Sequence, residues 1–296
     1  MIFPSNYRGR FAPSPTGPLH FGSLVAAVGS FLDARQSGGT WLVRMEDLDT
    51  PRCVPGAADD ILRTLEHFGL HWDESVWYQS QRLPHYQAAL DDLRLRELAY
   101  PCTCSRKTIA AHGERVYHGQ CRQQPPDLRQ PHAWRLQVPD EVLGFDDRAQ
   151  GHYAQALQQE VGDFVLKRLD GLFAYQLAVV VDDAAQGINQ VVRGADLLDS
   201  TPRQLYLQRC LHLPTPRYLH LPLAVNADGE KLSKQTLARP IREAAPVPLL
   251  RQVLDFLRQS PPTDFAHLDE LWGWAIAHWQ PTHFAHRLHQ PDPTTP

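Results

Sequence analysis

Apolar residues recur at helical spacing along much of the chain, and short apolar runs lie between these stretches. The stripe from Leu24 to Leu32 predicts a helix over residues 22–35, and the apolar run that follows predicts a buried strand over residues 41–45. A strand that returns after a helix forms a βαβ unit, in which ligands bind beyond the carboxyl ends of parallel strands. We therefore expect an α/β fold with a ligand-binding loop just before the first helix.

The rest of the chain continues this alternation, with two exceptions. Residues 133–165 are polar and poorly periodic apart from an expected strand at 134–136, and residues 289–296 form a proline-rich tail that we expect to be disordered. Elsewhere, helices are expected over residues 55–68, 81–99, 201–210, 247–258 and 268–279, strands over 188–196 and 219–225, and a hairpin over 164–173.

Residues 10–24 are extended and rich in proline, stop at a turn of small residues and lead directly into the first helix. At such a junction the first N–H groups of the helix have no partner within it, so a phosphate can bind there without a dedicated cation. Gly17 and Gly22 keep the backbone accessible, and His20 places an imidazole at the mouth of the loop. The stretch predicts a nucleotide-binding turn, and an ordinary proline-rich loop before a helix is the alternative.

Length, composition and charge limit the class of protein to which the chain can belong. With 296 residues, of which 43% are hydrophobic, the chain is long enough for one large α/β domain with an insertion or for two modest domains. No apolar run reaches the roughly 20 residues that span a bilayer, and residues 1–10 lack the apolar core of a secretion signal, so we expect a cytoplasmic protein that does not bind membranes. The net charge of −4 does not favour nucleic-acid binding, but arginines gather at residues 94–106 and 115–129, where a basic face could form.

Three of the five cysteines, Cys102, Cys104 and Cys121, gather in a short, proline-flanked stretch. In a reducing compartment this spacing suggests a metal before a disulfide, and a compact four-ligand zinc site fits it. Such a site has no open position for substrate, so the zinc would be structural. Zinc chemistry alone favours a histidine over a phenol as the fourth ligand, and three reduced cysteines without metal are the alternative. The candidates for the fourth ligand are His112, Tyr117 and His118.

Two motifs far apart in the sequence resemble the signatures of class I aminoacyl-tRNA synthetases. Residues 20–23 (HFGS) resemble the first signature, with serine in place of its last histidine, and residues 231–235 (KLSKQ) resemble the second, a lysine loop. Residues 10–17 (RFAPSPTG) look like the glutamate-specific branch of this class. The resemblance implies a Rossmann-like catalytic core of the class I type, interrupted by a zinc-bearing insertion.

The resemblance also implies roles for individual residues. It makes His20 and Lys234 catalytic, with ATP held by these two residues and by Gly22, Ser23 and Lys231. The chemistry of ATP adds an expected Mg²⁺, although the sequence shows no dedicated acidic motif for it. It assigns glutamate binding to Arg10, Ala12, Ser14, Glu46, Tyr175 and Arg193. It completes the zinc site of Cys102, Cys104 and Cys121 with Tyr117. An arginine suits the glutamate side chain because it can donate two parallel hydrogen bonds to a carboxylate.

Within this class the chain is similar to the small glutamyl-Q tRNA(Asp) synthetases, because little sequence follows the lysine loop, where a conventional glutamyl-tRNA synthetase carries an anticodon-binding region. The similarity implies a monomer that activates L-glutamate with ATP and transfers it to the queuosine base of tRNA(Asp). The alternatives are a shortened glutamyl-tRNA synthetase that charges the 3′ end and a catalytically decayed RNA-binding module. The expected divisions are a catalytic domain over residues 1–100 and 187–240, a zinc-bearing subdomain over 101–186 and a helical segment over 241–296.

Overall fold

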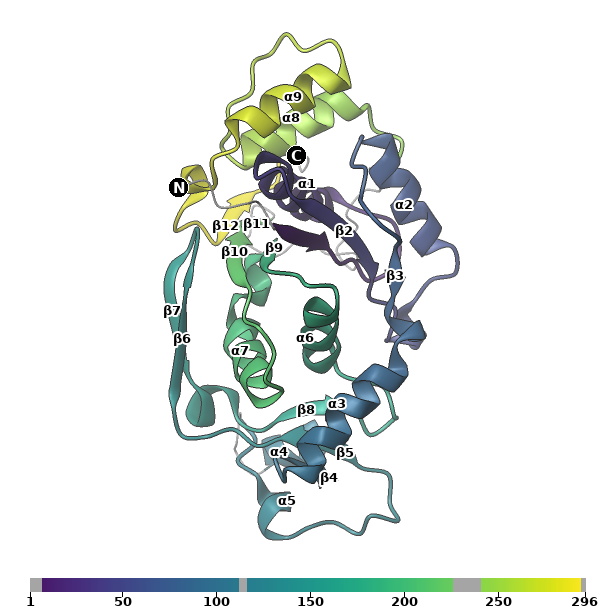
Figure 1. Ribbon diagram of the computed structural model, residues 1–296, viewed down its shortest axis with the longest axis vertical. Coiled ribbons are helices and arrows are strands. Elements are labelled where there is room, and N and C mark those ends of the chain that lie inside the picture. Colours follow the sequence, from purple (N-terminus) through teal and green to yellow (C-terminus); the bar gives the residue numbers. More distant parts are fainter. Residues whose placement is uncertain (1–6, 112–115, 226–240, 294–296) are drawn as a thin grey trace.

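The computed structural model describes residues 7–111, 116–225 and 241–293, which form an elongated molecule (Figure 1). Helices near the carboxyl end cap one tip, parallel strands lie next to them, and a small sheet whose first strand ends at Cys102 occupies the opposite tip. None of the helices in these ranges is both long and apolar enough to cross a lipid bilayer.

Short parallel strands form the centre of the larger half. β1 (Arg8–Phe11) pairs with β2 (Thr40–Met45), and β2 pairs with β3 (Trp77–Tyr78). A second parallel pair, β9 (Gln190–Gly194) and β10 (Arg217–Leu221), lies against β1. The predicted strands at 41–45 and 188–196 are therefore central to the fold, and ligands are expected beyond their carboxyl ends.

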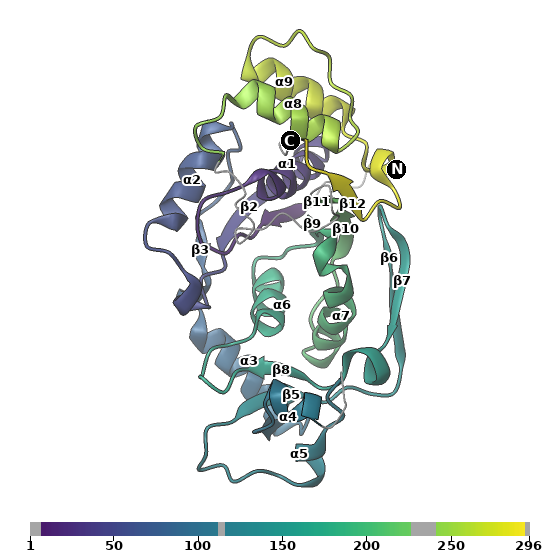
Figure 2. The same ribbon diagram turned by 180° about the vertical axis from the view of Figure 1, so that it is seen from behind.

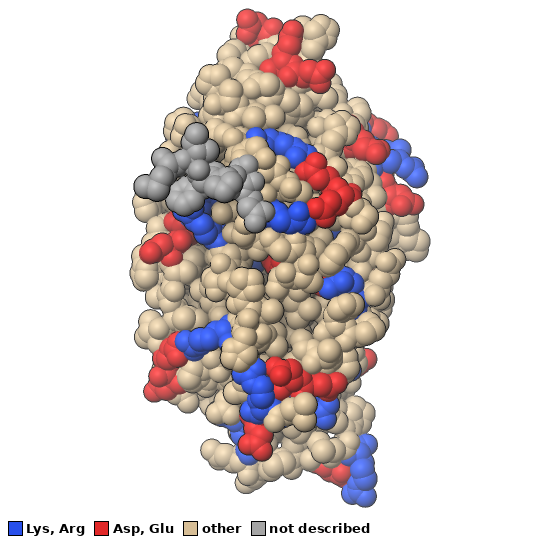
Figure 3. All heavy atoms as spheres, in the orientation of Figure 1, with Lys and Arg blue, Asp and Glu red and all other residues tan. Residues whose placement is uncertain are grey.

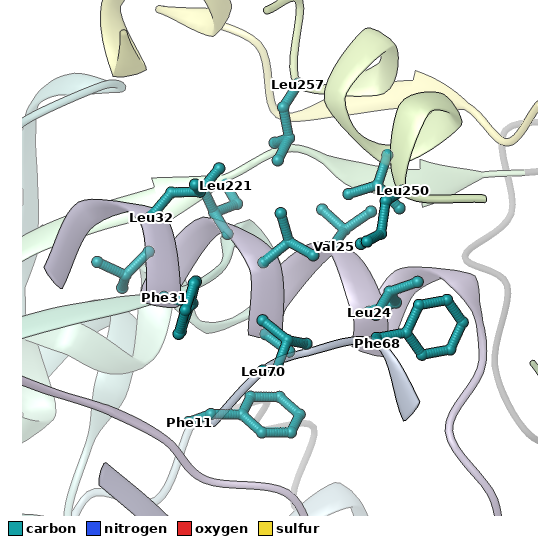
Figure 4. Close-up of a cluster of buried hydrophobic side chains, with 14 of the residues drawn as sticks. Phe11, Leu24, Val25, Phe31, Leu32, Phe68, Leu70, Leu221, Leu250 and Leu257 are labelled. Carbon is teal, nitrogen blue, oxygen red and sulfur yellow. The ribbon is translucent and has the colours of Figure 1, made fainter. Parts of the chain in front are cut away.

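Helix α1 (Phe21–Gln36) connects β1 to β2 and is covered on both sides. Its side chains Leu24 and Leu32 are fully buried. One side of the helix packs on β1, β2 and β9, and the other side packs on α8 (Pro246–Phe256) and α9 (Leu268–His278), as Figure 4 shows for the side chains around it. Burying one large apolar side chain contributes about 1.5–3 kcal/mol, so this packing holds the start of α1 firmly against the strand ends.

Three helices join the parallel strands to an antiparallel sheet at the opposite tip (Figure 2). The helices are α3 (Leu83–Leu95), α6 (Tyr175–Ala185) and α7 (Thr201–Cys210). The sheet consists of β4 (Ala99–Cys102), β5 (Ala133–Leu136) and β8 (Phe164–Lys167), with β5 in the middle. Because α6 packs against both α3 and α7, an apolar cluster links the cysteine-bearing tip to the centre.

A long antiparallel hairpin runs along one side of the molecule, within the region that the sequence pattern describes as poorly periodic. β6 (Val142–Asp147) and β7 (Gly151–Ala156) pair along their length, and β6 lies beside β10 (Figures 1 and 2). The turn between them is anchored, because the Arg148 guanidinium forms two hydrogen bonds of 2.6 and 2.8 Å with the Asp33 carboxylate of α1.

The end of the chain differs from the expectation of a disordered tail over residues 289–296. β12 (His289–Pro291) pairs in parallel with β11 (Leu223–Val225), and Asp292 N–H donates to the Val225 carbonyl at 2.9 Å. The expectation is wrong for the residues of β12, because backbone hydrogen bonds to a distant strand order them and composition does not reveal such bonds.

The predicted helices are confirmed to within about one turn, whereas α6 lies where the sequence pattern predicts no helix, and short elements complete the fold. Their bounds are Ala57–His67 for α2, Arg106–Ala111 for α4 and Gln120–Gln123 for α5. The 3₁₀ turns are Thr50–Arg52, Gln79–Gln81, Ala195–Ser200 and Pro281–Phe284, and a π-helical turn covers Leu157–Val161.

Candidate active site

Those residues predicted to bind ATP or glutamate that lie in the described ranges surround one cleft. The cleft has a volume of about 720 Å³ and lies where β1 and β9 end and α1 begins. Its walls include Arg10, Ala12, Ser14, His20, Gly22, Ser23, Glu46, Tyr175 and Arg193. The fold therefore brings together side chains from four separate segments, whereas their individual roles remain predictions.

One end of the cleft is the start of α1, where His20 is the N-cap residue. His20 Nδ1 accepts a hydrogen bond from the Ser23 backbone N–H at 3.4 Å, and Nε2 lies 3.1 Å from the Ser23 hydroxyl. The first turn of α1 carries no acidic side chain, so nothing on that turn neutralises the positive end of the helix dipole. This end of the cleft suits an anionic group such as a phosphate.

The lysine motif, with Lys231 and Lys234, lies outside the described residues, but both of its flanks reach the same end of the cleft. On the amino side, Ala224 of β11 lines the cleft wall. On the carboxyl side, Ile241 N–H donates to the Leu19 carbonyl, next to the histidine turn, at 3.3 Å. The fold thus attaches both ends of the lysine segment beside His20.

The other end of the cleft holds Arg193, a buried arginine of β9. Neutral groups surround its guanidinium, and in the described part of the chain no carboxylate lies within ion-pair distance of it. A buried cation without a paired anion is costly, so this arrangement favours an anionic ligand. Within the described ranges, the hydrogen-bond acceptors of Arg193 are His220 Nε2, Gln204 Oε1, the Leu197 carbonyl and the hydroxyls of Thr201 and Tyr175.

Four more charged residues form a buried network at this end. Arg10 donates to Asp183 at 2.9 Å, and Arg44 donates to the same carboxylate at 2.8 Å and to Glu46 at 3.3 Å. Burial alone would raise the pKa of Asp183, but the positive charges of Arg10 and Arg44 hold it below its usual range. Burial raises the pKa of Glu46 above its usual value, and Arg44 and Arg10 oppose this shift. Asp183 thus holds two arginines in place, and Glu46 provides an acidic group in the cleft wall.

Tyr175, the first residue of α6, lies between these two groups of charges. Its hydroxyl lies 3.4 Å from Arg193 Nη1. Burial raises the pKa of Tyr175, and the charges of Arg193, Glu46 and Arg10 all act on the same hydroxyl. Tyr175 therefore presents a neutral hydroxyl at the point where the predicted glutamate-binding side chains meet.

Three thiols and a phenol converge at the opposite tip of the molecule. The sulfur atoms of Cys102, Cys104 and Cys121 all lie within 4.8 Å of one another. The Cys102 thiol donates to the Tyr117 hydroxyl at 3.3 Å, and the Cys121 N–H donates to the same oxygen at 2.9 Å. Arg135 donates to Cys102 Sγ at 3.2 Å, which places a positive charge beside the sulfur.

This donor set of thiols and one phenol fits a four-coordinate ion of borderline softness such as Zn²⁺. Burial raises the pKa of Tyr117, so its oxygen would bind as a phenolate only if a cation displaced the proton. Of the other two candidate ligands, His118 is exposed and His112 lies outside the described residues. The geometry thus gathers Tyr117 with the three cysteines, whereas its role as a ligand remains a prediction.

A groove of about 1540 Å³ leads from the cysteine cluster to the cleft, and Ser14, Glu46 and Tyr175 line both spaces. Its charges are mixed, since Arg168 pairs with Asp170 at 2.6 Å across the groove wall. On the face in Figure 3, acidic and basic side chains likewise lie next to one another, without a broad patch of one sign. Charge alone therefore does not identify a nucleic-acid surface on this face.

Comparison with known proteins shows the family. Residues 6–245 match the family described as tRNA synthetases class I (E and Q), catalytic domain. The glutamyl-Q tRNA(Asp) synthetase of Dechloromonas aromatica (strain RCB) is 60% identical over 284 residues, which cover 93% of this chain and 94% of that protein. The protein of the same name from Chromobacterium violaceum is 57% identical over 278 residues, covering 92% and 93%.

The chain belongs to the glutamyl-Q tRNA(Asp) synthetase family. Solved structures of longer synthetases share its fold, which confirms the predicted class I α/β architecture. A glutamate tRNA ligase from Elizabethkingia meningosepticum, crystallised with its amino acid, matches 95% of this chain with a TM-score of 0.80 and 25% identity. The glutamate-tRNA synthetase of Elizabethkingia anophelis matches 95% with a TM-score of 0.81 and 24% identity. The chain covers 66% and 67% of these two proteins, about two thirds of their length.

Some polar residues around the cleft of this glutamyl-Q tRNA(Asp) synthetase family member belong to no recognisable motif, and the sequence analysis does not single them out. Arg44 is the one charged residue in the otherwise apolar run 41–45, which is a signal for a buried ion pair. Asp182 and Asp183 directly follow an apolar stretch of α6 and give a similar signal. The sequence around His220 and Asp147 gives no such signal. Their positions near the cleft depend on the register between β9 and β10 and on the placement of the β6–β7 hairpin.

Proposed function

We propose that this chain activates L-glutamate with ATP and transfers the glutamyl group to the queuosine base of tRNA(Asp). The observation that carries the proposal is the 60% identity, over 93% of the chain, to a protein named glutamyl-Q tRNA(Asp) synthetase. The cleft supports it, because one end suits a phosphate and the other suits a carboxylate.

The carboxylate end of the cleft would hold the glutamate substrate. Arg193 has a buried positive charge that neutral acceptors surround, and the side-chain carboxylate of glutamate would supply the anion that offsets it. Arg10 would assist from β1, and Glu46 with Tyr175 would receive the substrate's ammonium group. The loop residues Ala12 and Ser14 would line the rest of the pocket.

The activation step requires positioned charges and no covalent protein intermediate. The α-carboxylate of glutamate attacks the α-phosphorus of ATP, the bond to pyrophosphate breaks, and glutamyl-adenylate forms. Negative charge builds on the α-phosphate oxygens and on the leaving pyrophosphate, so donors and cations stabilise the transition state. The phosphates would be held by His20 and the α1 start at Gly22 and Ser23, with Lys231, Lys234 and Mg²⁺ stabilising the charge.

The transfer step requires the nucleoside to reach the same cleft. A hydroxyl of queuosine would attack the glutamyl carbonyl, so that an ester forms and AMP leaves. The groove from the cysteine cluster provides a route, because Glu46 and Tyr175 line both the groove and the cleft. A base that enters along the groove would therefore arrive beside the adenylate.

The cysteine cluster would bind one structural Zn²⁺ through Cys102, Cys104, Cys121 and Tyr117. The three sulfur atoms already lie within 4.8 Å of one another, and the Tyr117 oxygen is next to two of these residues. With four protein ligands, the ion would have no open position for substrate, so its function would be to stabilise the tip that borders the groove.

Two assays test the proposed function. Pyrophosphate exchange into ATP should depend on glutamate and should not need tRNA, and its absence would favour a binding module that performs no chemistry. Labelled glutamate is then offered to tRNA(Asp) with and without queuosine, and nuclease digestion locates the label. We expect it in the anticodon-loop fragment of queuosine-containing tRNA. Label on the 3′-terminal adenosine would instead identify a shortened glutamyl-tRNA synthetase.

A further inference from the structure

We infer that Asp147 and His220 are positioning residues of the amino-acid pocket, and that they set the orientation of the Arg193 guanidinium through a buried chain of hydrogen bonds. The inference rests on the proposed role of Arg193 in binding the glutamate side chain. Neither Asp147 nor His220 is part of the cleft wall, so both would act through Arg193.

The chain of hydrogen bonds starts at the pocket and ends at the hairpin turn. Strands β9 and β10 pair so that His220 lies opposite Arg193. Arg193 Nε donates to His220 Nε2 at 3.1 Å, and His220 Nδ1 lies 2.6 Å from Asp147 Oδ2. The side chains of His220 and Asp147 are completely buried, so water does not substitute for either partner.

The chemistry of these contacts fixes the tautomer of His220. An arginine nitrogen can only donate, so His220 Nε2 must accept, and the ring proton must be on Nδ1, from which it is donated to Asp147. Burial lowers the pKa of His220, as does the charge of Arg193, against the opposing effect of Asp147, so the ring is neutral. A neutral imidazole thus points its single acceptor at Arg193.

The two oxygens of Asp147 share the His220 backbone N–H, which lies 3.2 Å from Oδ1 and 3.1 Å from Oδ2, and otherwise have different partners. Oδ1 accepts hydrogen bonds from the backbone N–H groups of Ala149 and Gln150 at 3.0 and 2.9 Å and so holds the turn of the hairpin. Oδ2 accepts the ring proton of His220. An asparagine at this position would keep the first oxygen for the turn and place an amide N–H₂ opposite the imidazole.

Asp147→Asn is therefore the central test. The amide donor favours the tautomer with its proton on Nε2, which then faces the Arg193 donor and cannot accept from it. Losing a hydrogen bond to a charged group corresponds to about a 10- to 100-fold change in an equilibrium constant. We expect the glutamate KM in pyrophosphate exchange to rise by about this factor, with kcat and the ATP KM nearly unchanged. An unchanged glutamate KM would overturn the inference.

Substitutions of His220 decide whether Asp147 acts through it. His220→Gln offers an amide oxygen to Arg193 without needing Asp147, so the glutamate KM of this variant should stay near the wild-type value. His220→Leu offers no acceptor and should raise the glutamate KM as Asp147→Asn does. In the His220→Gln background, adding Asp147→Asn should have little further effect. If the double variant shows the full Asp147→Asn defect, Asp147 does not act through the imidazole.

Asp146→Asn is the matched control, because among the described residues its exposed side chain pairs only with the exposed His152 on the same hairpin. ¹⁵N NMR of histidine-labelled wild-type protein supplies a readout that does not depend on activity. A buried ring with its proton on Nδ1 supports the inference, and a proton on Nε2 would refute it even if Asp147→Asn failed to fold. If the wild type shows no glutamate-dependent exchange, the proposed function fails, while the NMR result still judges the hydrogen-bond chain.

Discussion

Two buried arginines in the cleft, Arg10 and Arg193, have different electrostatic environments. The charge of Arg10 is balanced within the protein by Asp183, at 2.9 Å. The charge of Arg193 meets only the dipoles of neutral groups in the described part of the chain. A charge left unbalanced in the free protein is available to a ligand. Removing the Asp183 partner of Arg10 should therefore act mainly on stability, and substitution of Arg193 mainly on binding.

Arg193→Ala should weaken glutamate binding more than any later step. Removing two hydrogen bonds to a carboxylate, at about 1.5–3 kcal/mol each, should raise the glutamate KM by about 100-fold or more. Steady-state pyrophosphate exchange measures this, with the ATP KM as internal reference. Arg217→Ala is the control, because Arg217 is an exposed arginine on the adjacent strand β10. An unchanged glutamate KM in Arg193→Ala would exclude the proposed role.

Asp183→Asn should instead reduce stability, because it removes the shared anion of Arg10 and Arg44 and leaves buried positive charge. Breaking a buried ion pair in this way costs about 3–5 kcal/mol, which corresponds to a fall of about 10 °C in melting temperature. Asp170→Asn, an exposed aspartate paired with Arg168, is the control and should change the melting temperature little.

The same substitution has an expected pH dependence. The pKa of Asp183 is lower in the folded state than its usual value, so its contribution to stability is complete above the usual aspartate range and is lost as the pH falls through the lowered pKa. Urea unfolding should therefore show a wild-type advantage over Asp183→Asn that is largest near neutral pH and shrinks in acid. An advantage that stays constant down to about pH 3 would contradict this account.

At the scale of elements, the sequence pattern predicts the helices and strands that bury one apolar face. It misses the helices and strands that are defined by contacts with distant parts of the chain. Helix α1 is predicted because Leu24 and Leu32 repeat at helical spacing. Helix α6 is missed because its apolar run is continuous and shows no period. The β6–β7 hairpin is missed because its polarity does not follow its burial: apolar Val142 is exposed, whereas polar Asp147 and Gln155 are buried.

The same distinction applies to the candidate site. His20, Glu46 and Arg193 stand in motifs or at strand ends, where local sequence indicates a ligand. The function inferred for His220 follows from its register opposite Arg193, and that for Asp147 from the position of a hairpin turn. Single-sequence patterns contain neither register nor hairpin placement, so these supporting residues become visible only in the structure.

The cysteine-bearing tip yields a prediction about metal content. The purified protein should contain about one Zn²⁺ per chain, and Cys121→Ser should lose it and expose the region around residue 121 to limited proteolysis. Cys53→Ser, a substitution of a cysteine outside the cluster, should keep the metal. Elemental analysis with a protease time course tests both. A wild-type protein prepared without chelator that holds no metal would refute the zinc proposal.

At the scale of the whole molecule, the carboxyl-terminal helices are part of the same hydrophobic core as the parallel strands. Leu250, Val253 and Leu254 of α8 belong to one buried cluster with Leu24 of α1 and Leu221 of β10 (Figure 4). Trp279 Nε1 also donates to Asp33 of α1 at 3.1 Å. These contacts place α8 and α9 behind the helix whose first turn borders the His20 end of the cleft, so the helices support the cleft indirectly.

Leu254→Ala tests whether this segment unfolds together with the core. Leu254 is 1% exposed, and replacing such a leucine costs about 2–5 kcal/mol. If α8 and the strands form one cooperative unit, calorimetry should show a single transition about 5–15 °C lower than in the wild type. Leu95→Ala, at a leucine of α3 that is 85% exposed, should change it little. A separate early transition, with the main one unchanged, would show that α8 and α9 unfold independently of α1. In that case their contacts would not stabilise the start of α1, and pyrophosphate exchange would survive heating past the first transition.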